Sequence, residues 1–256
     1  MTKKILVEAD GPVTVITINR PEVRNALDKE SAGMLADAFR AFDADETARV
    51  TVLTGADGAF CAGADLKEMA EAADYQAWAT SESGPTQPLM SKPVIAAIAG
   101  HACAGGLGLA LWCDIRIADE TAVFGVFSRR WGVPMSDGTT VRLPRLIGMS
   151  RALDMMITGR PIEAKEAEAI GLATRLVPAG QALDAARDLA HQVAAFPQIA
   201  LRSDRRSMYA QDGLPTADAL QSETALAAEA RDREAQPGAA RFAAGAGRHG
   251  RFDDKS

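Results

Sequence analysis

The stretch that most constrains this chain is HACAGGLGLALWCD, residues 101–114, where an apolar run opens with Gly105, Gly106 and Gly108. Glycine has no Cβ, so backbone rich in glycine lets other groups approach it closely. Three kinds of structure need such backbone near the centre of a 256-residue chain. They are a loop that binds phosphate, a membrane span, and a pair of backbone N–H groups aimed at one ligand.

The membrane interpretation is weak. Residues 94–113 are uncharged and long enough to cross a bilayer. They also contain several glycines and His101, and no second apolar segment of this length accompanies them. Val94–Ile98 is a short apolar run between Pro93 and Gly100, which is typical of a buried β-strand. We therefore expect a buried strand, a turn and a helix here, and no membrane association.

The phosphate interpretations are also weak. A dinucleotide loop needs G-x-G-x-x-G, and Gly106-Leu107-Gly108 begins that pattern but Leu111 occupies the third glycine position. A nucleotide-binding P-loop needs Gly-Lys followed by Ser or Thr, and the chain has no such triplet.

A second segment, FCAGADLKEM at residues 60–69, favours the third possibility. In both segments a strand leads through small residues into a helix, and the first N–H groups of a helix have no partner within it. One N–H group from each segment can then stabilise negative charge on a single carbonyl oxygen, each donor contributing about 3 kcal/mol. The alternative is that both segments are only tight turns before buried helices.

The first half of the chain alternates between strand and helix patterns. A hairpin is predicted over residues 4–18 around Asp10-Gly11, and a helix from an Asp28 N-cap to about Phe42. Further strands are predicted at residues 50–55, 94–98 and 114–125, and a helical stretch at residues 66–82. This order indicates βαβ crossovers and a parallel sheet covered by helices.

The second half, from about Ser150, has almost only helical patterns, interrupted by glycine and proline. The formal net charge of −6 and the pI near 5.2 give no electrostatic basis for binding nucleic acid. Three dispersed cysteines without CxxC spacing indicate neither disulfides nor a zinc site. Because the N-terminus also lacks a signal-peptide pattern, we expect a cytoplasmic protein.

The motifs FCAGADLKEM and GHACAGGLGLALWCDIRIA together resemble the crotonase, or enoyl-CoA hydratase/isomerase, superfamily. Matches continue in the family's order with NRPEVRNALD, LPRLIG, ALDMMITGRPIEAKEAEAIGLATRLVP and GAGRHGRF. The resemblance implies an α/β fold, a spiral of ββα units over residues 1–195. It assigns residues 196–256 to a helical region that mediates trimerisation and covers the CoA site. It also implies an acyl-CoA substrate, no cofactor beyond that CoA, and a homotrimer or dimer of trimers.

Several site residues follow from the resemblance, position by position. The amides of Ala64 and Gly105 would form the oxyanion hole. The residues that would contact CoA or substrate are Arg24, Ala26, Leu27, Ala62, Asp65, Leu66, Gly106, Trp131 and Phe252. Alternatives stay open for three of them: a solvated surface role for Arg24, and packing roles for Trp131 and Phe252.

The chain departs from the family where the hydratases carry their two catalytic glutamates. Those positions fall on Gly108 and Ser128, and neither residue can do acid–base work. Asp137 lies in a loop where several family members carry a catalytic aspartate, and burial there would raise its pKa toward useful values. The alternative for Asp137 is an ordinary turn residue in Ser-Asp-Gly.

Other polar residues near these motifs have bland interpretations that we prefer. His101 is expected to be a structural histidine, Cys103 a packing residue, and Arg129 and Arg130 a solvated pair. The alternative for the arginines is that one of them pairs with Asp137 or with an acidic acyl group.

The sequence thus predicts an acyl-CoA enzyme that stabilises an enolate or oxyanion through two backbone N–H groups. Asp137 is the candidate acid–base residue. The alternative is a non-catalytic acyl-CoA carrier or sensor with the same fold.

Overall fold

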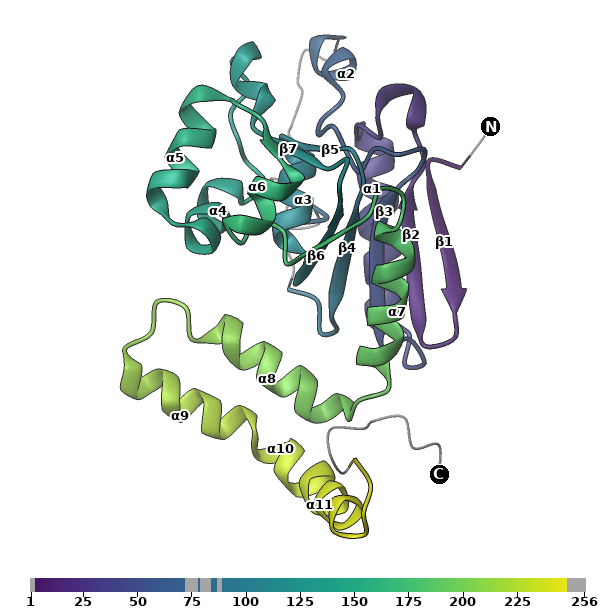
Figure 1. The fold of residues 1–256 in the computed structure, drawn as a ribbon, viewed down its shortest axis with the longest axis vertical. Coiled ribbons are helices and arrows are strands. Elements are labelled where there is room, and N and C mark those ends of the chain that lie inside the picture. The colour runs from purple at the N-terminus through teal and green to yellow at the C-terminus, as the bar shows by residue number, and fades with distance from the viewer. Residues whose placement is uncertain (1–2, 72–77, 79–83, 87–88, 248–256) are drawn as a thin grey trace. The chain divides into compact units, whose positions relative to one another are not determined.

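In the computed structural model the described residues are 3–71, 78, 84–86 and 89–247 (Figure 1). The chain divides into two compact units, Met1–Ala194 and Ala195–Ser256. The expected role of the second unit in oligomerisation stays a prediction.

A six-stranded sheet forms the centre of the first unit, in the order β1-β2-β3-β4-β6-β9. Its strands are β1 (Ile5–Asp10), β2 (Val13–Ile18), β3 (Val50–Gly55), β4 (Val94–Ile98), β6 (Ile115–Asp119) and β9 (Arg175–Val177). The β1–β2 hairpin is antiparallel, and every later pair in the sheet is parallel.

Both faces of the inner strands β2, β3 and β4 are buried, which explains the uninterrupted apolar run in β4. On one face, Ile16, Leu53 and Ile98 lie in the same core cluster as residues of α1 (Lys29–Ala44). On the other face, Val15, Val52 and Ile95 pack with α7 (Ala182–Ala194). The apolar side chains of these inner strands therefore alternate between two core clusters.

A smaller sheet of three strands, in the order β5-β7-β8, lies next to the glycine-rich segment. Its strands are β5 (His101–Cys103), β7 (Val123–Gly125) and β8 (Ile162–Glu163). The glycine-rich helix α3 (Gly105–Trp112) begins two residues after β5. The other helices of the first unit are α2 (Leu66–Glu71), α4 (Thr139–Ile147), α5 (Met149–Thr158) and α6 (Ala164–Ala169).

The second unit is helical throughout its described part. It contains α8 (Gln198–Ala210), α9 (Thr216–Leu226), α10 (Ala228–Ala230) and α11 (Gln236–Ala243), with α8 and α9 side by side (Figure 1). Glu234 accepts hydrogen bonds from the N–H groups of Ile199 (3.1 Å) and Ala200 (2.7 Å). It thereby satisfies two of the free donors in the first turn of α8.

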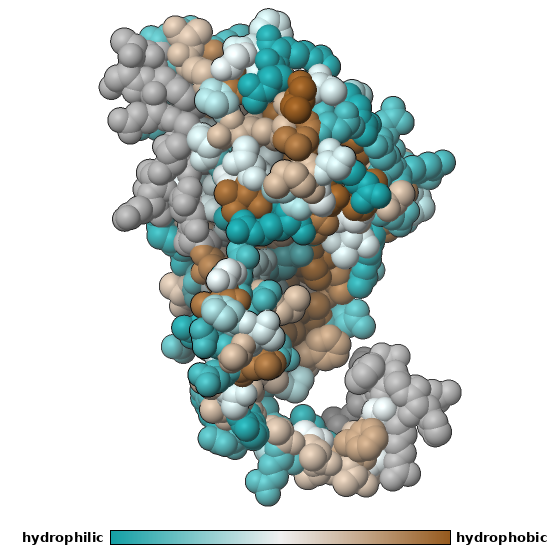
Figure 2. Space-filling model, turned by 90° about the vertical axis from the view of Figure 1, so that its left-hand side faces the viewer, coloured by the Kyte–Doolittle hydropathy of each residue, from teal (hydrophilic) through white to brown (hydrophobic). Residues whose placement is uncertain are grey.

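Large apolar side chains remain exposed on both units. On α5 they are Met149, Leu153 and Ile157, which follow each other at intervals of four residues and so share one side of the helix. Figure 2 shows exposed apolar side chains, in brown, scattered among polar ones on the face that it presents. On the second unit, Met208 is 75% exposed and Phe242 is 65% exposed.

Most elements predicted from the sequence are confirmed. The hairpin, the helix that begins after Asp28, the strands at residues 50–55 and 94–98, and the parallel sheet are all present. Asp28 is the N-cap of α1 and forms a capping box with Ser31. Of the helical stretch predicted at residues 66–82, only α2 is described as helix, and residues 72–77 and 79–83 lie outside the described residues. No helix in the described part of the chain is long and apolar enough to cross a membrane.

Two predictions of secondary structure were wrong. Residues 114–125 form two strands in different sheets, since a turn after Asp119 redirects the chain. The region after Ser150 also contains β8 and β9, which helical patterns alone did not predict. Strands of two and three residues are too short to give an alternating pattern, and they form because β7 and β6 offer free edges to pair with.

Asn25 fixes the loop that precedes α1. Its side chain is fully buried, accepts a hydrogen bond from Arg20 N (2.9 Å), and donates to the carbonyls of Ala56 (2.8 Å) and Ala59 (2.6 Å). Arg24 and Asn25 both have positive φ, 51° and 57°, which is unusual for residues other than glycine. The three side-chain hydrogen bonds hold this strained backbone against the loop after β3.

Replacing Asn25 by Ala should therefore lower the free energy of unfolding by about 3 kcal/mol, because buried carbonyls lose their donor. Denaturant unfolding followed by circular dichroism measures this change. Asn19→Ala is the matched control, since its amide donates to Lys3 O at an exposed position. The control should lose less than about 1 kcal/mol. Equal losses in the two variants would contradict the role given to Asn25.

Candidate active site

Three segments that are distant in the sequence meet at the start of α3. Cys61 N donates to His101 O (2.9 Å) and Cys103 N donates to Cys61 O (3.0 Å), which pairs residues 61–63 with β5. Leu27 N donates to Gly63 O (2.7 Å), which adds the loop before α1. The segments 60–69 and 101–114, singled out in the sequence, are therefore neighbours.

The backbone N–H groups of Ala64 and of Gly105, the first residue of α3, lie at this junction and have no acceptor among the described residues. The two backbones are close, because a Cβ added to Gly63 would lie 2.9 Å from Gly105 N. Ala104, just before Gly105, has φ 48° and ψ −121°, a strained conformation for alanine. This strained turn sets the direction of the Gly105 N–H group.

The glycines of α3 are needed for close approach. A Cβ on Gly106 would lie 1.9 Å from the Cys61 carbonyl oxygen, and backbone cannot move aside as a flexible side chain can. At Gly105 the obstacle would be Trp78, at 2.7 Å, and at Gly108 it would be the Asp137 carboxyl carbon, at 2.4 Å. Each glycine of this helix thus makes room for a different neighbour.

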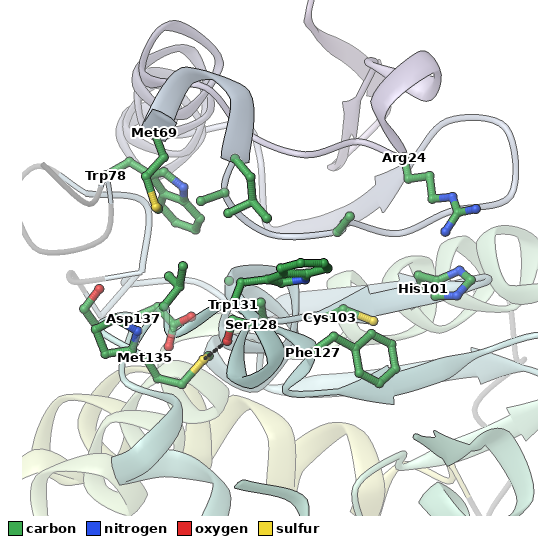
Figure 3. A pocket seen from close by; sticks show the side chains of 18 residues that line it. Arg24, Met69, Trp78, His101, Cys103, Phe127, Ser128, Trp131, Met135 and Asp137 are labelled. Carbon is green, nitrogen blue, oxygen red and sulfur yellow. Dashed lines mark hydrogen bonds between the residues drawn. The ribbon is translucent and has the colours of Figure 1, made fainter. Parts of the chain in front are cut away.

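A cavity of about 190 Å³ opens over this junction (Figure 3). It is lined by parts of the segments around residues 62–69, 101–105 and 127–137, together with Arg24 and Trp78. Figure 3 shows Arg24 and His101 at one end of the cavity, and Asp137, Met135, Met69 and Trp78 at the other.

Asp137 is the carboxylate of the cavity, and its side chain is almost completely buried. One carboxyl oxygen, Oδ1, accepts a hydrogen bond from Thr139 N (2.9 Å). The backbone carbonyl of Asp137 accepts a hydrogen bond from Arg142 Nη1 (3.0 Å), which holds the loop in place. Burial raises the pKa of Asp137 above its ordinary value, and the hydrogen bonds from Thr139 only partly oppose this.

Seven of the predicted site residues line the cavity: Arg24, Ala62, Ala64, Leu66, Gly105, Trp131 and Asp137. Trp131 is 71% exposed, so the alternative that it packs in the core was wrong. It lies at the end of a short 3-10 helix, Phe127–Trp131, whose buried residue is Ser128.

Four predicted residues do not line the cavity. Leu27 and Ala26 are buried, and Gly106 packs against Cys61. The Asp65 carboxylate forms an ion pair with Arg20 Nη2 (3.0 Å) and accepts a hydrogen bond from Lys67 N (3.1 Å). Phe252 lies outside the described residues, so its predicted role stays a prediction.

Sequence reasoning missed the apolar wall of the cavity, above all Met69, Trp78, Phe127 and Met135. Met69 and Trp78 gave no signal of their own, because apolar residues in a helical stretch usually indicate core. Phe127 and Met135 flank the loop of Asp137, and that proximity in the sequence could have found them.

The other polar candidates are accounted for. Arg130 stacks over the Phe127 ring at 5.0 Å, and Arg129 Nε donates to Met156 O (3.3 Å), so neither of these contacts involves Asp137. Ser128 Oγ contacts Met135 Sδ at 3.5 Å. Burial raises the pKa of the Cys103 thiol to about 12, so this group is neutral at pH 7 and a poor nucleophile. Among the described residues, no three His, Cys, Asp or Glu side chains are grouped to hold a metal ion.

Comparisons with known proteins identify the family of the chain. The family model described as "Enoyl-CoA hydratase/isomerase" matches residues 8–246. Enoyl-CoA hydratase EchA19 of Mycobacterium tuberculosis is 36% identical over 228 residues, which cover 86% of each chain. A probable enoyl-CoA hydratase of Rhizobium meliloti is 38% identical over 224 residues, covering 87% of each chain.

Solved structures agree as well. The crystal structure of enoyl-CoA hydratase EchA1 from Mycobacterium marinum superposes with a TM-score of 0.89 at 33% identity, covering 94% of this chain and 96% of that one. An enoyl-CoA hydratase from Bacillus anthracis gives a TM-score of 0.88 at 33% identity, with the same coverage. The chain is therefore an enzyme of the enoyl-CoA hydratase/isomerase family and has the crotonase fold of that superfamily.

Proposed function

We propose that this protein binds an acyl-CoA thioester, stabilises its enolate through the N–H groups of Ala64 and Gly105, and moves a proton with Asp137. The observation that carries the proposal is that one cavity holds both unpartnered N–H groups and a buried carboxyl group. No metal or redox cofactor is needed, because the chemistry is proton transfer next to a carbonyl.

In this mechanism the thioester oxygen accepts hydrogen bonds from both amides. Negative charge grows on that oxygen as the α-proton leaves, and each aimed donor is worth about 3 kcal/mol to the transition state. The ionised Asp137 takes the α-proton and can return it to the same carbon or to another carbon of the acyl group. A carboxyl group whose pKa is raised by burial is a stronger base when ionised and a usable acid when protonated.

The position of Asp137 favours proton transfer over the addition of water. Family hydratases carry one glutamate at the position of Gly108, and here the Asp137 carboxyl group occupies the space where that side chain would begin. The second glutamate position is Ser128, whose hydroxyl faces Met135. A single carboxyl group suits proton transfer, such as double-bond isomerisation or lyase chemistry, better than the concerted addition of water by two carboxyl groups.

Arg24 and the second unit have proposed roles in binding and assembly. Arg24 lies at the end of the cavity away from Asp137, where its guanidinium can meet the phosphates of CoA. The exposed apolar residues of α5, α8 and α11 support association into a homotrimer or a dimer of trimers, because a monomer would leave them in water.

A non-catalytic acyl-CoA carrier is the second candidate. The observation in its favour is the loss of both glutamates, at Gly108 and Ser128. The burial of the Asp137 carboxyl group in the cavity argues against it, because burying such a group costs stability and carboxyl groups with raised pKa values cluster at functional sites.

Exchange of the α-protons of a saturated acyl-CoA in heavy water, followed by mass spectrometry, tests the proposal without assuming the full reaction. Wild-type protein should catalyse exchange, and Asp137→Asn should lower the rate by about 10²–10⁴-fold while ester binding stays intact. Asp184→Asn, an exposed change on α7, is the control and should exchange at the wild-type rate. Binding without exchange in the wild type would favour the carrier instead.

Asp137→Asn, which should lower the exchange rate, should raise the stability of the protein at neutral pH. Burial raises the pKa of folded Asp137 above 3.8, so the folded state is favoured most below that value and loses stability as pH rises through the raised pKa. Asp137→Asn should therefore melt at least about 2 °C above the wild type at pH 7, with the gap closing below pH 4. Thermal unfolding across this pH range measures it, and a gap independent of pH would show that Asp137 does not titrate as described.

A further inference from the structure

The two ends of the cavity differ in charge. Among the described residues that line it, the basic side chains are Arg24 and His101, and both lie at the end away from Asp137 (Figure 3). A CoA ester carries its phosphates at one end and its acyl group at the other. The basic end therefore suits the phosphates, and the acyl group is left to the end formed by Asp137, Met135, Met69 and Trp78.

Trp78 stands directly against the proposed oxyanion hole. A Cβ on Gly105 would lie 2.7 Å from Cζ2 and 3.2 Å from Cη2 of the indole, so this ring edge packs on the Gly105 backbone. Trp78 is half-buried and packs against the main core cluster of the first unit. A ring packed on Gly105 and against the core forms a wall beside the carbon atoms next to the thioester carbonyl.

Asp137 closes the cavity one turn further along α3. Gly105 and Gly108 are three residues apart and so lie on the same side of the helix. Trp78 covers the first glycine, and the Asp137 carboxyl group covers the second. The space for an acyl group is therefore bounded along α3 by the indole and by the carboxyl group.

The size of the cavity agrees with a short acyl group. Its volume of about 190 Å³ is below the roughly 300–1,000 Å³ of sites that bury a drug-sized ligand. That volume has to hold the thioester end of CoA as well as the acyl carbons. An acyl chain of eight carbons would need Trp78 to leave its position on Gly105.

The chemistry of this end also selects against a charged acyl group. Its labelled wall residues Met69, Trp78 and Met135 are apolar, and its ionisable group is the acid Asp137. A carboxylate on the acyl group would meet a like charge and no nearby basic lining residue, which is unfavourable in a buried site.

We infer that Trp78 restricts this enzyme to CoA esters of short, uncharged acyl groups of a few carbons. The inference rests on the proposed function, since it takes the acyl group to lie at the Asp137 end. It assigns to Trp78 the part of a specificity-determining residue.

Titration calorimetry with butyryl-CoA, octanoyl-CoA and succinyl-CoA tests this on the full-length protein. Wild type should bind butyryl-CoA at least about tenfold more tightly than either of the other esters. Trp78→Ala should shift the octanoyl-to-butyryl affinity ratio toward octanoyl by tenfold or more, because each methylene group newly buried adds about fourfold. Trp131→Ala is the matched control at the exposed rim and should change both affinities alike, leaving the ratio within about twofold.

Equal affinity of the wild type for butyryl-CoA and octanoyl-CoA would overturn the inference, and so would an unchanged ratio in a Trp78→Ala variant that melts cooperatively. If Trp78→Ala does not fold, Trp78→Phe takes its place and should give a smaller shift in the same direction. Failure of all three esters to bind would overturn the proposed function itself. Selective binding of butyryl-CoA without proton exchange would remove only the role of Asp137 as base and leave the inference standing.

Discussion

The close contact between two backbones, at residues 61–63 and 104–106, is the constraint on which the site depends. Gly106 packs so tightly on the Cys61 carbonyl that no side chain fits between them. This contact brings the end of one strand segment beside the start of α3, and it is held by the hydrogen bonds of Cys61 with His101 and Cys103. The amides of Ala64 and Gly105 lie next to each other because the backbones do. Any residue larger than glycine at position 106 would force them apart.

The rest of the fold keeps this junction rigid. The parallel sheet is buried between two core clusters, so β3 and β4, the strands that lead into the two segments, are fixed on both faces. Asn25 joins the loop before α1 to the loop after β3: its side chain accepts one hydrogen bond within its own loop and donates two to the other loop. Precise placement matters here because backbone donors stabilise a transition state only when they are oriented before the reaction begins. A stable core is therefore a condition of the proposed chemistry as well as of folding.

Asp137, the proposed acid–base group, does not lie on the glycine-rich helix α3. Its carboxyl group comes from a loop after β7 and lies over Gly108. Glycine at position 108 is what gives the aspartate room to lie there. This supports assigning the chain to proton-transfer chemistry within its family.

The sequence alone predicted the β1–β2 hairpin, α1 with its Asp28 cap, the parallel sheet and the family, because these depend on local patterns and on motifs whose order is visible in the chain. It also identified the segments of Ala64, Gly105 and Asp137. It could not predict β8 and β9, which exist only through pairing with distant strands. Nor could it predict Trp78 and Met69 as cavity walls, because an apolar side chain looks the same in a sequence whether it faces the core or a ligand. Only the tertiary structure decided which of them lie beside α3, since that depends on chain segments far apart in sequence packing against one another.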